Sequence, residues 1–417
     1  MSQPNNANPI QPNERMLELD VLRGFAIFGI LIVNMQFFST AFQYLSRVRA
    51  NMWTEEGDKL AKLLIDSFAS GNFYTMFSFL FGIGMIIFLD RARAKGIRAV
   101  PLFLRRVTIL LLIGLVHALL IWYGDILVEY AVLSFFLILF ARAKPRLVLA
   151  SAFFFLLLRP VLTYFGAYQK ITVPLYSASG LGNQLCDVNG LLDRANAAYQ
   201  YGTYGDQVGQ RLVDFVYQYG TFWALFPVVF AMFLFGVYAA KKRIFHDVEG
   251  NIKLIRLVWL GSLIVALLTT FFKSDLTAVN TISFKYVYSQ WFLSLRNPAI
   301  CFFYVTSIIQ LLRLPALRAA SLPIATVGRM ALSNYLASSL ICTTLFYSFG
   351  FGLFNKVGPG TGLLISLLIY PLLVVFSILW LRHFRYGPVE WIWRTLTYGK
   401  LQSMRLPASK ATSTAAE

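Results

Sequence analysis

The sequence predicts an all-α, polytopic membrane protein with about ten transmembrane helices and both termini in the cytoplasm. The 417 residues are 58% hydrophobic and only 13% charged, and their mean hydropathy is +0.63, which is not the composition of a soluble domain. Apolar runs of about 18 residues or more recur from residue 22 to residue 381. Basic residues concentrate in alternate loops between these runs, as expected for loops that stay in the cytoplasm.

The apolar runs and the charges of the loops together place the spans in order. We expect spans at residues 22–42, 70–89, 105–123, 125–141, 147–166, 221–240, 254–272, 290–311, 321–347 and 362–381. The segments predicted to lie inside carry 24 Lys and Arg residues, six of them between Arg91 and Arg106, and those predicted outside carry 10. The formal net charge of +18 is explained by basic residues in short loops that set the topology, so no nucleic-acid partner is needed to explain it. The excess of basic residues on the inside favours cytoplasmic termini.

The segments outside the spans are short, with one exception. Residues 1–16 are polar and lack the apolar core of a cleavable signal, so we expect the first span to act as its own insertion signal. Residues 43–69 are predicted to form an amphipathic segment on the outer side. Residues 167–220 are rich in Gly, Asn, Gln and Tyr and are expected to form loops plus one amphipathic helix near residues 206–219, as an extracytoplasmic cap or lid.

The first span carries a polar stripe. Arg23 and Asn34 are eleven residues apart, which brings them within about 20° of each other on a helix, and Asp20 lies about 40° from the same line. Hydrocarbon does not tolerate such a stripe cheaply. We therefore expect this face to point into the bundle or into a cavity.

Two further polar residues are expected at the depth of Asn34. His117 and Arg159 lie twelve and thirteen residues past the basic residues that begin their spans, so all three side chains are expected roughly 16 to 20 Å from the cytoplasmic boundary. If their helices are neighbours, the three line one cavity, with Asp125 and Glu129 near its outer mouth. The alternative is that each side chain makes a separate hydrogen bond within the bundle.

His117 is the only histidine within a predicted span, and therefore the only imidazole base expected in the bundle. It could take a proton from a substrate hydroxyl or amine that attacks a thioester, with Asp125 or Glu129 orienting the ring. A structural histidine bonded to a carbonyl is the alternative. Arg329 and Asn334 add a second polar pair within a span, on different faces and with separate partners.

No metal site, disulfide framework or phosphate loop is indicated by the sequence. The three cysteines lack the spacing of metal ligands. The glycine pairs at 82 and 84 and at 350 and 352 are expected to serve helix packing or bending, because neither stands between a strand and a helix.

Four segments carry a resemblance to a known family. They are Leu19–Gly24 with Asn34, His117–Leu127, Gly328–Leu336 and Phe384–Lys400. They resemble the YeiB-like family of bacterial membrane proteins, whose C-terminal half is known as a domain of unknown function. The resemblance covers nearly the whole chain and implies a multi-pass protein of the bacterial inner membrane.

The opening segment is also similar to a wider group of transmembrane acyltransferases, which includes the lysosomal heparan-glucosaminide acetyltransferase and the bacterial sugar O-acyltransferases. That similarity implies acyl transfer from cytoplasmic acyl-CoA. The sugar O-acyltransferases have a catalytic histidine eleven residues after their arginine, whereas this chain has Asn34 there. If the chain is an acyltransferase, its base must come from elsewhere, and His117 is the candidate.

The resemblances imply an organisation in four parts. Residues 1–166 would form an acyltransferase-like region of five helices, residues 167–220 an extracytoplasmic loop or lid, residues 221–400 a YeiB-like domain of five helices, and residues 401–417 a disordered tail.

Three functional hypotheses follow. In the first, the protein is a membrane-embedded acyltransferase that uses acetyl-CoA or another acyl-CoA as a co-substrate, binds no permanent cofactor and acylates a small-molecule or glycan acceptor. Its catalytic residues would be His117, Asp125 and Asn34, and its binding residues Asp20, Arg23, Glu129, Arg159 and Arg329. In the second, the same polar level binds the substrate of a transporter or exporter of a small metabolite. In the third, the protein is a scaffold in the envelope. All three place the chain in the lipid bilayer, and none involves nucleic acid.

Overall fold

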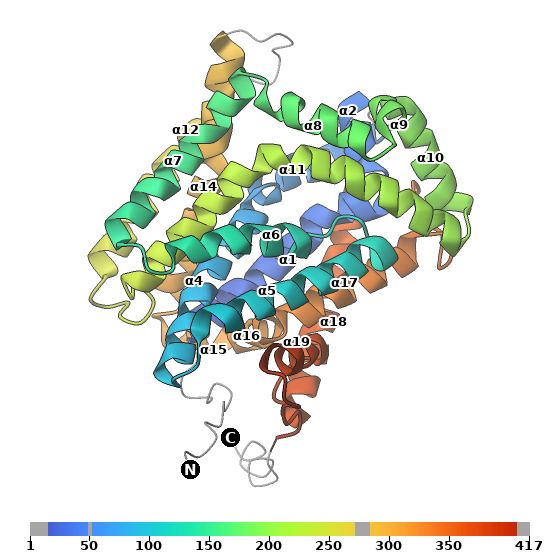
Figure 1. The fold of residues 1–417 in the computed structure, drawn as a ribbon. Helices are drawn as coiled ribbons and strands as arrows, with labels where there is room; N and C mark the ends of the chain where they lie inside the picture. The colour runs from blue at the N-terminus through green and yellow to red at the C-terminus, as the bar shows by residue number, and fades with distance from the viewer. Residues whose placement is uncertain (1–15, 49–51, 272–283, 407–417) are drawn as a thin grey trace.

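The computed structural model describes residues 16–48, 52–271 and 284–406, and these residues form a bundle of helices (Figure 1). Its long helices are α1 (Leu17–Ser39), α4 (Asn72–Ala94), α5 (Ala99–Val116), α6 (Leu127–Leu137), α7 (Pro145–Tyr164), α11 (Tyr204–Lys241), α12 (Ile252–Phe271), α14 (Phe284–Leu311), α17 (Ala331–Phe346) and α18 (Pro359–His383). Shorter helices are α2 (Phe42–Val48), α3 (Glu56–Leu64), α8 (Ala167–Ala178), α9 (Gly182–Cys186), α10 (Val188–Tyr201), α15 (Pro315–Ala320), α16 (Leu322–Arg329) and α19 (Pro388–Tyr398).

A helix occurs at each of the ten predicted spans. The ninth span is broken, because α16 ends at Arg329 and α17 begins at Ala331, with Met330 outside helical geometry between them. Among the described residues, seven helices are long and apolar enough to cross a membrane, and the apolar helices Leu127–Phe140 and Ala331–Phe346 are shorter. The chain therefore has the helices of a membrane protein, while the number of ten spans stays a prediction.

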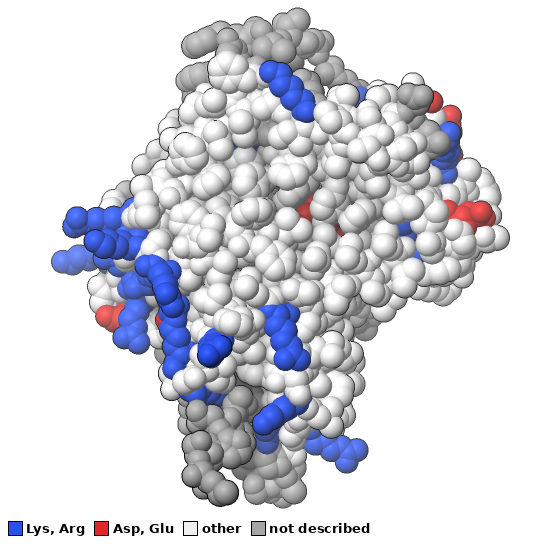
Figure 2. Space-filling view, viewed as in Figure 1, with Lys and Arg blue, Asp and Glu red and all other residues white. Residues whose placement is uncertain are grey.

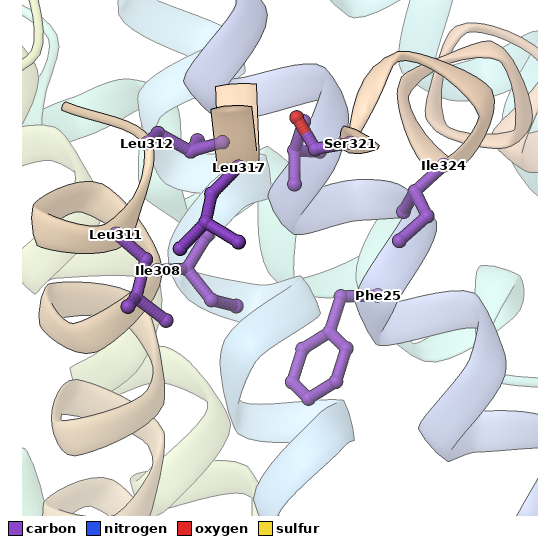
Figure 3. A pocket seen from close by; sticks show the side chains of 8 residues that line it. Phe25, Ile308, Leu311, Leu312, Leu317, Ser321 and Ile324 are labelled. Carbon is purple, nitrogen blue, oxygen red and sulfur yellow. The ribbon is translucent and has the colours of Figure 1, made fainter. Parts of the chain in front are cut away.

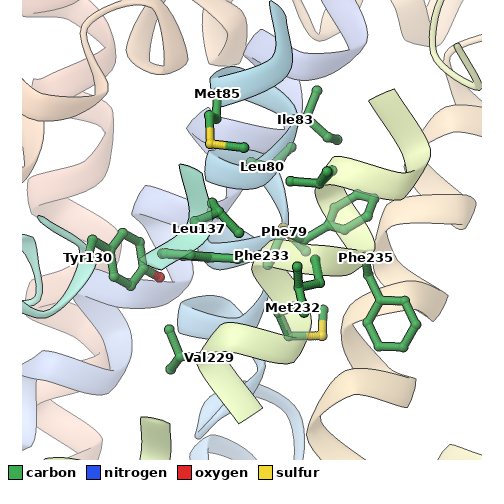
Figure 4. Close-up of a cluster of buried hydrophobic side chains, with 14 of the residues drawn as sticks. Phe79, Leu80, Ile83, Met85, Tyr130, Leu137, Val229, Met232, Phe233 and Phe235 are labelled. Carbon is green, nitrogen blue, oxygen red and sulfur yellow. The ribbon is translucent and has the colours of Figure 1, made fainter. Parts of the chain in front are cut away.

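The hydrophobic core is built mainly around α4 and α11. Figure 4 shows Phe79, Leu80 and Ile83 of α4 facing Val229, Met232 and Phe233 of α11. The two backbones can approach closely because glycine lies on both sides of the contact. A Cβ atom at Gly82 would collide with the carbonyl of Phe233, and one at Gly236 would collide with the carbonyl of Phe79. The expected packing role is thus confirmed for the first glycine of the pair at 82 and 84.

Helices from the two predicted regions, 1–166 and 221–400, contribute to this one core. Helix α1 packs against α16 and α18, and α11 packs against α4 and α7. Because the two regions share one core, their packing does not mark a boundary between residues 1–166 and residues 221–400, and that division stays a prediction from the sequence.

Loops that the sequence assigns to one side of the membrane contact each other in the structure. At what we call the inner end, the loops meet through four contacts: Arg318 with Glu18 (3.0 Å), Lys241 with the carbonyl of Ala141 (2.8 Å), Arg313 with Glu249 (2.8 Å) and Trp393 with the carbonyl of Arg106 (2.8 Å). Lys and Arg gather at the left edge and lower part of Figure 2, whereas the middle of this face has almost no charge. This pattern agrees with a membrane protein, and the assignment of the inner end to the cytoplasm stays a prediction.

The opposite end, which we call the outer end, contains more helix than expected. Helices α8, α9 and α10 and the first half of α11 occupy residues 167–220, where loops and one helix were predicted. The predicted helix near 206–219 exists, but it continues into the following span as part of α11, which begins at a capping box formed by Thr203 and Asp206. The prediction of loops failed because aromatic residues in this polar segment, such as Tyr176 and Tyr199, are buried in a second core cluster with Phe354.

The structure describes residues 401–406, the first part of the predicted disordered tail. The backbone N–H of Arg385 donates to the carbonyl of Met404 (2.8 Å), and Trp391 Nε1 donates to the carbonyl of Gln402 (2.7 Å). Residues 401–406 are thus held against α19. The remainder of the prediction, residues 407–417, lies outside the described residues.

Candidate functional site

A cavity of about 530 Å³ lies in the outer half of the bundle. Helices α1, α2, α4, α6, α11 and α17 surround it, together with the π-helical turn η2 (Ile65–Ala69). Asn34, Asp125, Glu129, Gln218 and Tyr335 supply polar atoms to its wall, and aromatic rings supply much of the rest. Such a mixture of aromatic walls and a few converging polar groups is typical of a small-molecule site.

His117 and Asp125 form a buried pair beside this cavity. The imidazole Nδ1 and the carboxylate Oδ2 are 2.7 Å apart, and each residue is only 1% exposed. A carboxylate can only accept, so Nδ1 carries the proton, and a neutral ring then presents its lone pair at Nε2. Nε2 has no hydrogen-bond partner among the described residues. An imidazole held in this way has the arrangement of a general base with its orienting carboxylate.

The local backbone explains how the pair forms. Helix α5 ends in a π-helical turn, η3 (His117–Ile121), in which the N–H of Trp122 donates to the carbonyl of His117 at 2.8 Å. Asp125 stands at the start of α6, where its Oδ1 accepts the N–H of Val128 at 2.8 Å. The carboxylate therefore caps α6 with one oxygen and holds His117 with the other.

Close packing and two further hydrogen bonds fix the turn between the helices. A Cβ atom at Gly114 would lie 2.8 Å from the backbone nitrogen of Val128, so only glycine allows α5 to approach α6 here. Tyr335 Oη donates to the carbonyl of Gly124, and Gln218 Nε2 donates to the carbonyl of Asp125, both at 3.4 Å. Helices α11 and α17 thus hold the main chain of this turn through its carbonyl groups.

His117 does not itself line the cavity, contrary to the sequence-based expectation. The rings of Trp122 and Tyr335 both contact it, with centroids 6.3 and 5.2 Å from the imidazole, and both line the cavity. Helices α5 and α1 both begin earlier than predicted, since His117 lies 18 residues past the start of α5 at Ala99 and Asn34 lies 17 residues past the start of α1 at Leu17, so the two keep a similar depth. The sequence suggested a later start for α5, because the charged residues Arg105 and Arg106 stand in its second turn.

Asn34 and Glu129 reach the cavity as predicted. The side chain of Asn34 makes no hydrogen bond to another described residue, so its amide is available to a ligand. Glu129 is 5% exposed, and the side chain of Gln218 donates to its carboxylate. Asp125 and Glu129 lie near enough to interact electrostatically, so this wall of the cavity is acidic.

Arg159 lies behind the wall of the cavity. It is half-buried on α7, and its charge acts on Tyr74, which lines the cavity. The predicted cavity therefore includes Asn34 directly, whereas His117 and Arg159 stand behind aromatic side chains.

Asp20, Arg23 and Arg329 lie away from the cavity, at the inner end. Arg23 Nη1 donates to Asp20 Oδ1 at 2.9 Å, and the charge of Asp20 acts on Arg329. Asn334 instead donates to Ser377 Oγ (2.9 Å) and to the carbonyl of Val327 (3.2 Å). Asn334 thus has hydrogen-bond partners of its own, whereas a separate partner for Arg329 stays a prediction.

A second, smaller pocket of about 170 Å³ lies between α1, α14, α15 and α16 (Figure 3). Its wall consists of apolar side chains such as Phe25, Ile308 and Leu312, and Ser321 supplies its polar atom. It has no charged group that could perform chemistry. Across the described residues, no cluster of three or more His, Cys, Asp or Glu side chains is arranged to hold a metal ion.

Sequence reasoning missed Trp122, Gln218 and Tyr335. Trp122 lies near the end of the predicted span 105–123, and Gln218 lies in the helix predicted near residues 206–219. Tyr335 stands in the segment Gly328–Leu336, which carried part of the family resemblance. That resemblance was the signal that could have identified it, since the residue pattern around it gives no chemical clue.

Comparisons with known proteins find relatives along almost the whole chain. Residues 239–400 match a family described as "Protein of unknown function (DUF418)". The chain is 37% identical over 409 residues to the uncharacterized protein YxaH of Bacillus subtilis (strain 168), covering 94% of this chain and 96% of the relative. It is 30% identical over 398 residues to the uncharacterized protein YeiB of Escherichia coli (strain K12), covering 92% and 96%.

A third relative is an uncharacterized 39.9 kDa protein of Bacillus acidopullulyticus, which is 28% identical over 399 residues and covers 94% of this chain and 96% of the relative. No solved structure matches.

Proposed function

The chain belongs to the YeiB-like family, and we propose that it is a membrane-embedded acyltransferase of the bacterial inner membrane. It would move an acyl group from cytoplasmic acyl-CoA to a small-molecule or glycan acceptor within or across the bilayer. The observation that carries the proposal is the buried His117–Asp125 pair, whose Nε2 lacks a partner beside a polar cavity. A buried polar atom without a partner calls for an explanation, and a catalytic role is one such explanation.

The chemistry would proceed by direct transfer. Nε2 of His117 takes the proton of the acceptor hydroxyl or amine as that atom attacks the thioester carbonyl. A carbon–oxygen or carbon–nitrogen bond forms, the carbon–sulfur bond breaks, and the CoA thiolate takes the proton back from the imidazolium. Asp125 keeps Nδ1 protonated and stabilises the imidazolium throughout.

Asn34 and Glu129 would have supporting roles. The free amide of Asn34 faces the cavity and can donate to the thioester oxygen, on which negative charge develops. Glu129 can bind a hydroxyl or amine of the acceptor. Trp122 and Tyr335 must turn aside before Nε2 can meet the acceptor, so substrate binding would open the base to the cavity.

The test is acyl transfer by the purified protein in lipid nanodiscs. Labelled acetyl-CoA is supplied with a panel of sugars and amines, and transfer of label from CoA to acceptor is measured. His117→Gln should lower the rate by about 10²- to 10⁴-fold, the usual contribution of a general base. His383→Gln is the matched control, because His383 is exposed at the end of α18. Equal rates for wild type and His117→Gln would overturn the mechanism.

A transporter of a small metabolite is the second candidate, and one observation favours it. His117 stands behind Trp122 and Tyr335, whereas Asp125 and Glu129 line the cavity, which suits a binding site better than a catalytic one. This function needs no thioester. Uptake of a metabolite by proteoliposomes without acyl-CoA, abolished by Glu129→Gln but not by His117→Gln, would favour transport over acyl transfer.

A further inference from the structure

Four arginines converge at the inner end of the bundle. Arg23 is near the start of α1, Arg106 is in α5, Arg329 ends α16, and Arg394 lies on α19. The positive charges of Arg394 and Arg23 both act on Arg106. The cluster therefore draws on four helices that are distant in sequence.

Few acidic groups balance these charges. Asp20 forms an ion pair with Arg23 at 2.9 Å and is the acid that acts on Arg329. Glu390, the other nearby acid, is already engaged, because it accepts the N–H of Leu332 (2.7 Å) and of Ser333 (3.1 Å) and bonds the Ser333 hydroxyl. It therefore serves as the cap of α17. Within the described ranges, Arg106, Arg329 and Arg394 form no ion pair.

Aromatic faces hold two of these guanidinium groups in place. Arg106 Cζ lies 3.5 Å from the ring centroid of Trp393 and 5.1 Å from that of Phe88. Arg394 Cζ lies 4.6 Å from the ring centroid of Tyr386. A guanidinium that is stacked by its face keeps the N–H groups at its edge available to a second partner.

There is also space beside Arg23, one member of the cluster. A Cβ atom at Gly84 of α4 would meet a single neighbouring atom within 4.0 Å, which is Nη2 of Arg23. The second glycine of the pair at 82 and 84 thus borders open room next to the guanidinium, whereas the first packs against α11.

We propose that Arg23, Arg106 and Arg394 form a binding site for a phosphate or diphosphate group at the inner end of the bundle. Planar guanidinium groups bind phosphate oxygens through paired hydrogen bonds, and an excess of fixed positive charge beside an open space favours a dianionic ligand. An anionic lipid headgroup and a soluble molecule such as CoA share this chemistry. The site is independent of acyl transfer, because a transporter or a scaffold could use it equally.

The experiment measures binding to the full-length protein in nanodiscs of phosphatidylcholine, with CoA and inorganic pyrophosphate as soluble probes. Wild type should bind one of them with an affinity that falls as ionic strength rises. Arg106→Gln and Arg394→Gln should each weaken binding about tenfold or more. Arg98→Gln removes the same charge from an exposed position at the start of α5 and should leave binding unchanged.

A second arm tests the lipid as the source of the phosphate. Nanodiscs that contain phosphatidylglycerol are used, and native mass spectrometry counts the lipids that remain on the protein. A soluble ligand is indicated if the pyrophosphate or CoA affinity changes in Arg106→Gln, and a lipid is indicated if bound phosphatidylglycerol is lost instead. The proposal is overturned if CoA, pyrophosphate and phosphatidylglycerol each bind equally to wild type, Arg106→Gln and Arg394→Gln. The unfolding temperature of Arg394→Gln, if equal to that of wild type, shows that this variant is folded.

Discussion

Substitution of Asp125 separates its two structural roles. Oδ2 accepts from His117, and Oδ1 accepts from the N–H of Val128. Asp125→Asn keeps an oxygen for the cap of α6, but it turns an N–H group toward Nδ1 of His117. The imidazole must then accept at Nδ1 and carry its proton at Nε2, where a base needs a lone pair.

The expected magnitudes follow from these two bonds. Asp125→Asn exchanges a charge-assisted hydrogen bond for a neutral one, which should lower the free energy of unfolding by about 1–2 kcal/mol. The rate of acyl transfer should fall by about 10²- to 10⁴-fold, because the tautomer is wrong. Asp125→Ala also removes the cap, worth about 1 kcal/mol, and leaves Nδ1–H buried without an acceptor, so the loss of stability should reach about 2–4 kcal/mol.

The assay combines transfer from labelled acetyl-CoA with thermal unfolding of the same nanodisc samples. Asp187→Asn is the matched control, since Asp187 caps α10 through the N–H of Gly190 at 3.0 Å on the exposed surface and contacts no histidine. Transfer by Asp125→Asn at the wild-type rate would refute the role of the pair. A transfer rate that falls only in proportion to the folded fraction would show that Asp125 is structural.

Three further predictions concern the stability of the fold. Glu390→Ala should lower the free energy of unfolding by about 2–4 kcal/mol, because two N–H groups at the start of α17 lose their acceptor. An unchanged unfolding temperature would contradict the capping role of Glu390. Gly236→Val should lower the free energy of unfolding, measured by chemical denaturation, by at least about 1–3 kcal/mol, because the valine side chain collides with α4. Gly261→Val should have no such effect, because a side chain there meets open space. Equal effects of the two substitutions would exclude the close contact as the cause. The carboxylate of Asp214 accepts hydrogen bonds from Tyr44 and Tyr199 (2.5 Å each), and burial raises its pKa to about 6 from an unfolded value near 4. The folded state therefore binds the proton more tightly than the unfolded state. The free energy of unfolding should fall by about 3 kcal/mol as the pH rises from about 4 to 6. Asp214→Asn should remove this pH dependence of the unfolding temperature, and a slope that persists would assign it to another group.

The helical fold could be predicted from the sequence because each predicted span is a long apolar run. The assignment of loops to the inner and outer sides depends on their charges and stays a prediction. The break at Met330 could not, because Arg329 and Ala331 both lie within one continuous apolar run and the cap that stabilises the second helix is Glu390, nearly sixty residues later. The outer helices were missed for a similar reason. Their stability depends on buried contacts such as Tyr199 with Asp214, which no local pattern reveals.

The site could be predicted in its chemistry but not in its exposure. The sequence left either Asp125 or Glu129 as the group that orients His117, and the structure places Asp125 Oδ2 at 2.7 Å from the imidazole Nδ1. Whether the imidazole faces the cavity depends on where Trp122 and Tyr335 lie. Those positions are set by the packing of Trp122 on Phe38, at 4.0 Å between ring centroids, and by the bond from Tyr335 to the carbonyl of Gly124.

The two proposed sites are related by the geometry of two helices. Arg23 and Asn34 are eleven residues apart on α1, and Arg106 and His117 are eleven residues apart along α5 into its terminal π-turn. Eleven residues make about three turns, so each pair lies on one helix face with a rise of roughly 16 Å. A phosphate group bound at the arginines of the inner end would therefore be about 16 Å from Asn34 and His117. A ligand long enough to join both sites must carry its reactive group on an extended arm, as an acyl-CoA does, whereas a lipid headgroup at the arginines would leave the outer cavity to a separate substrate.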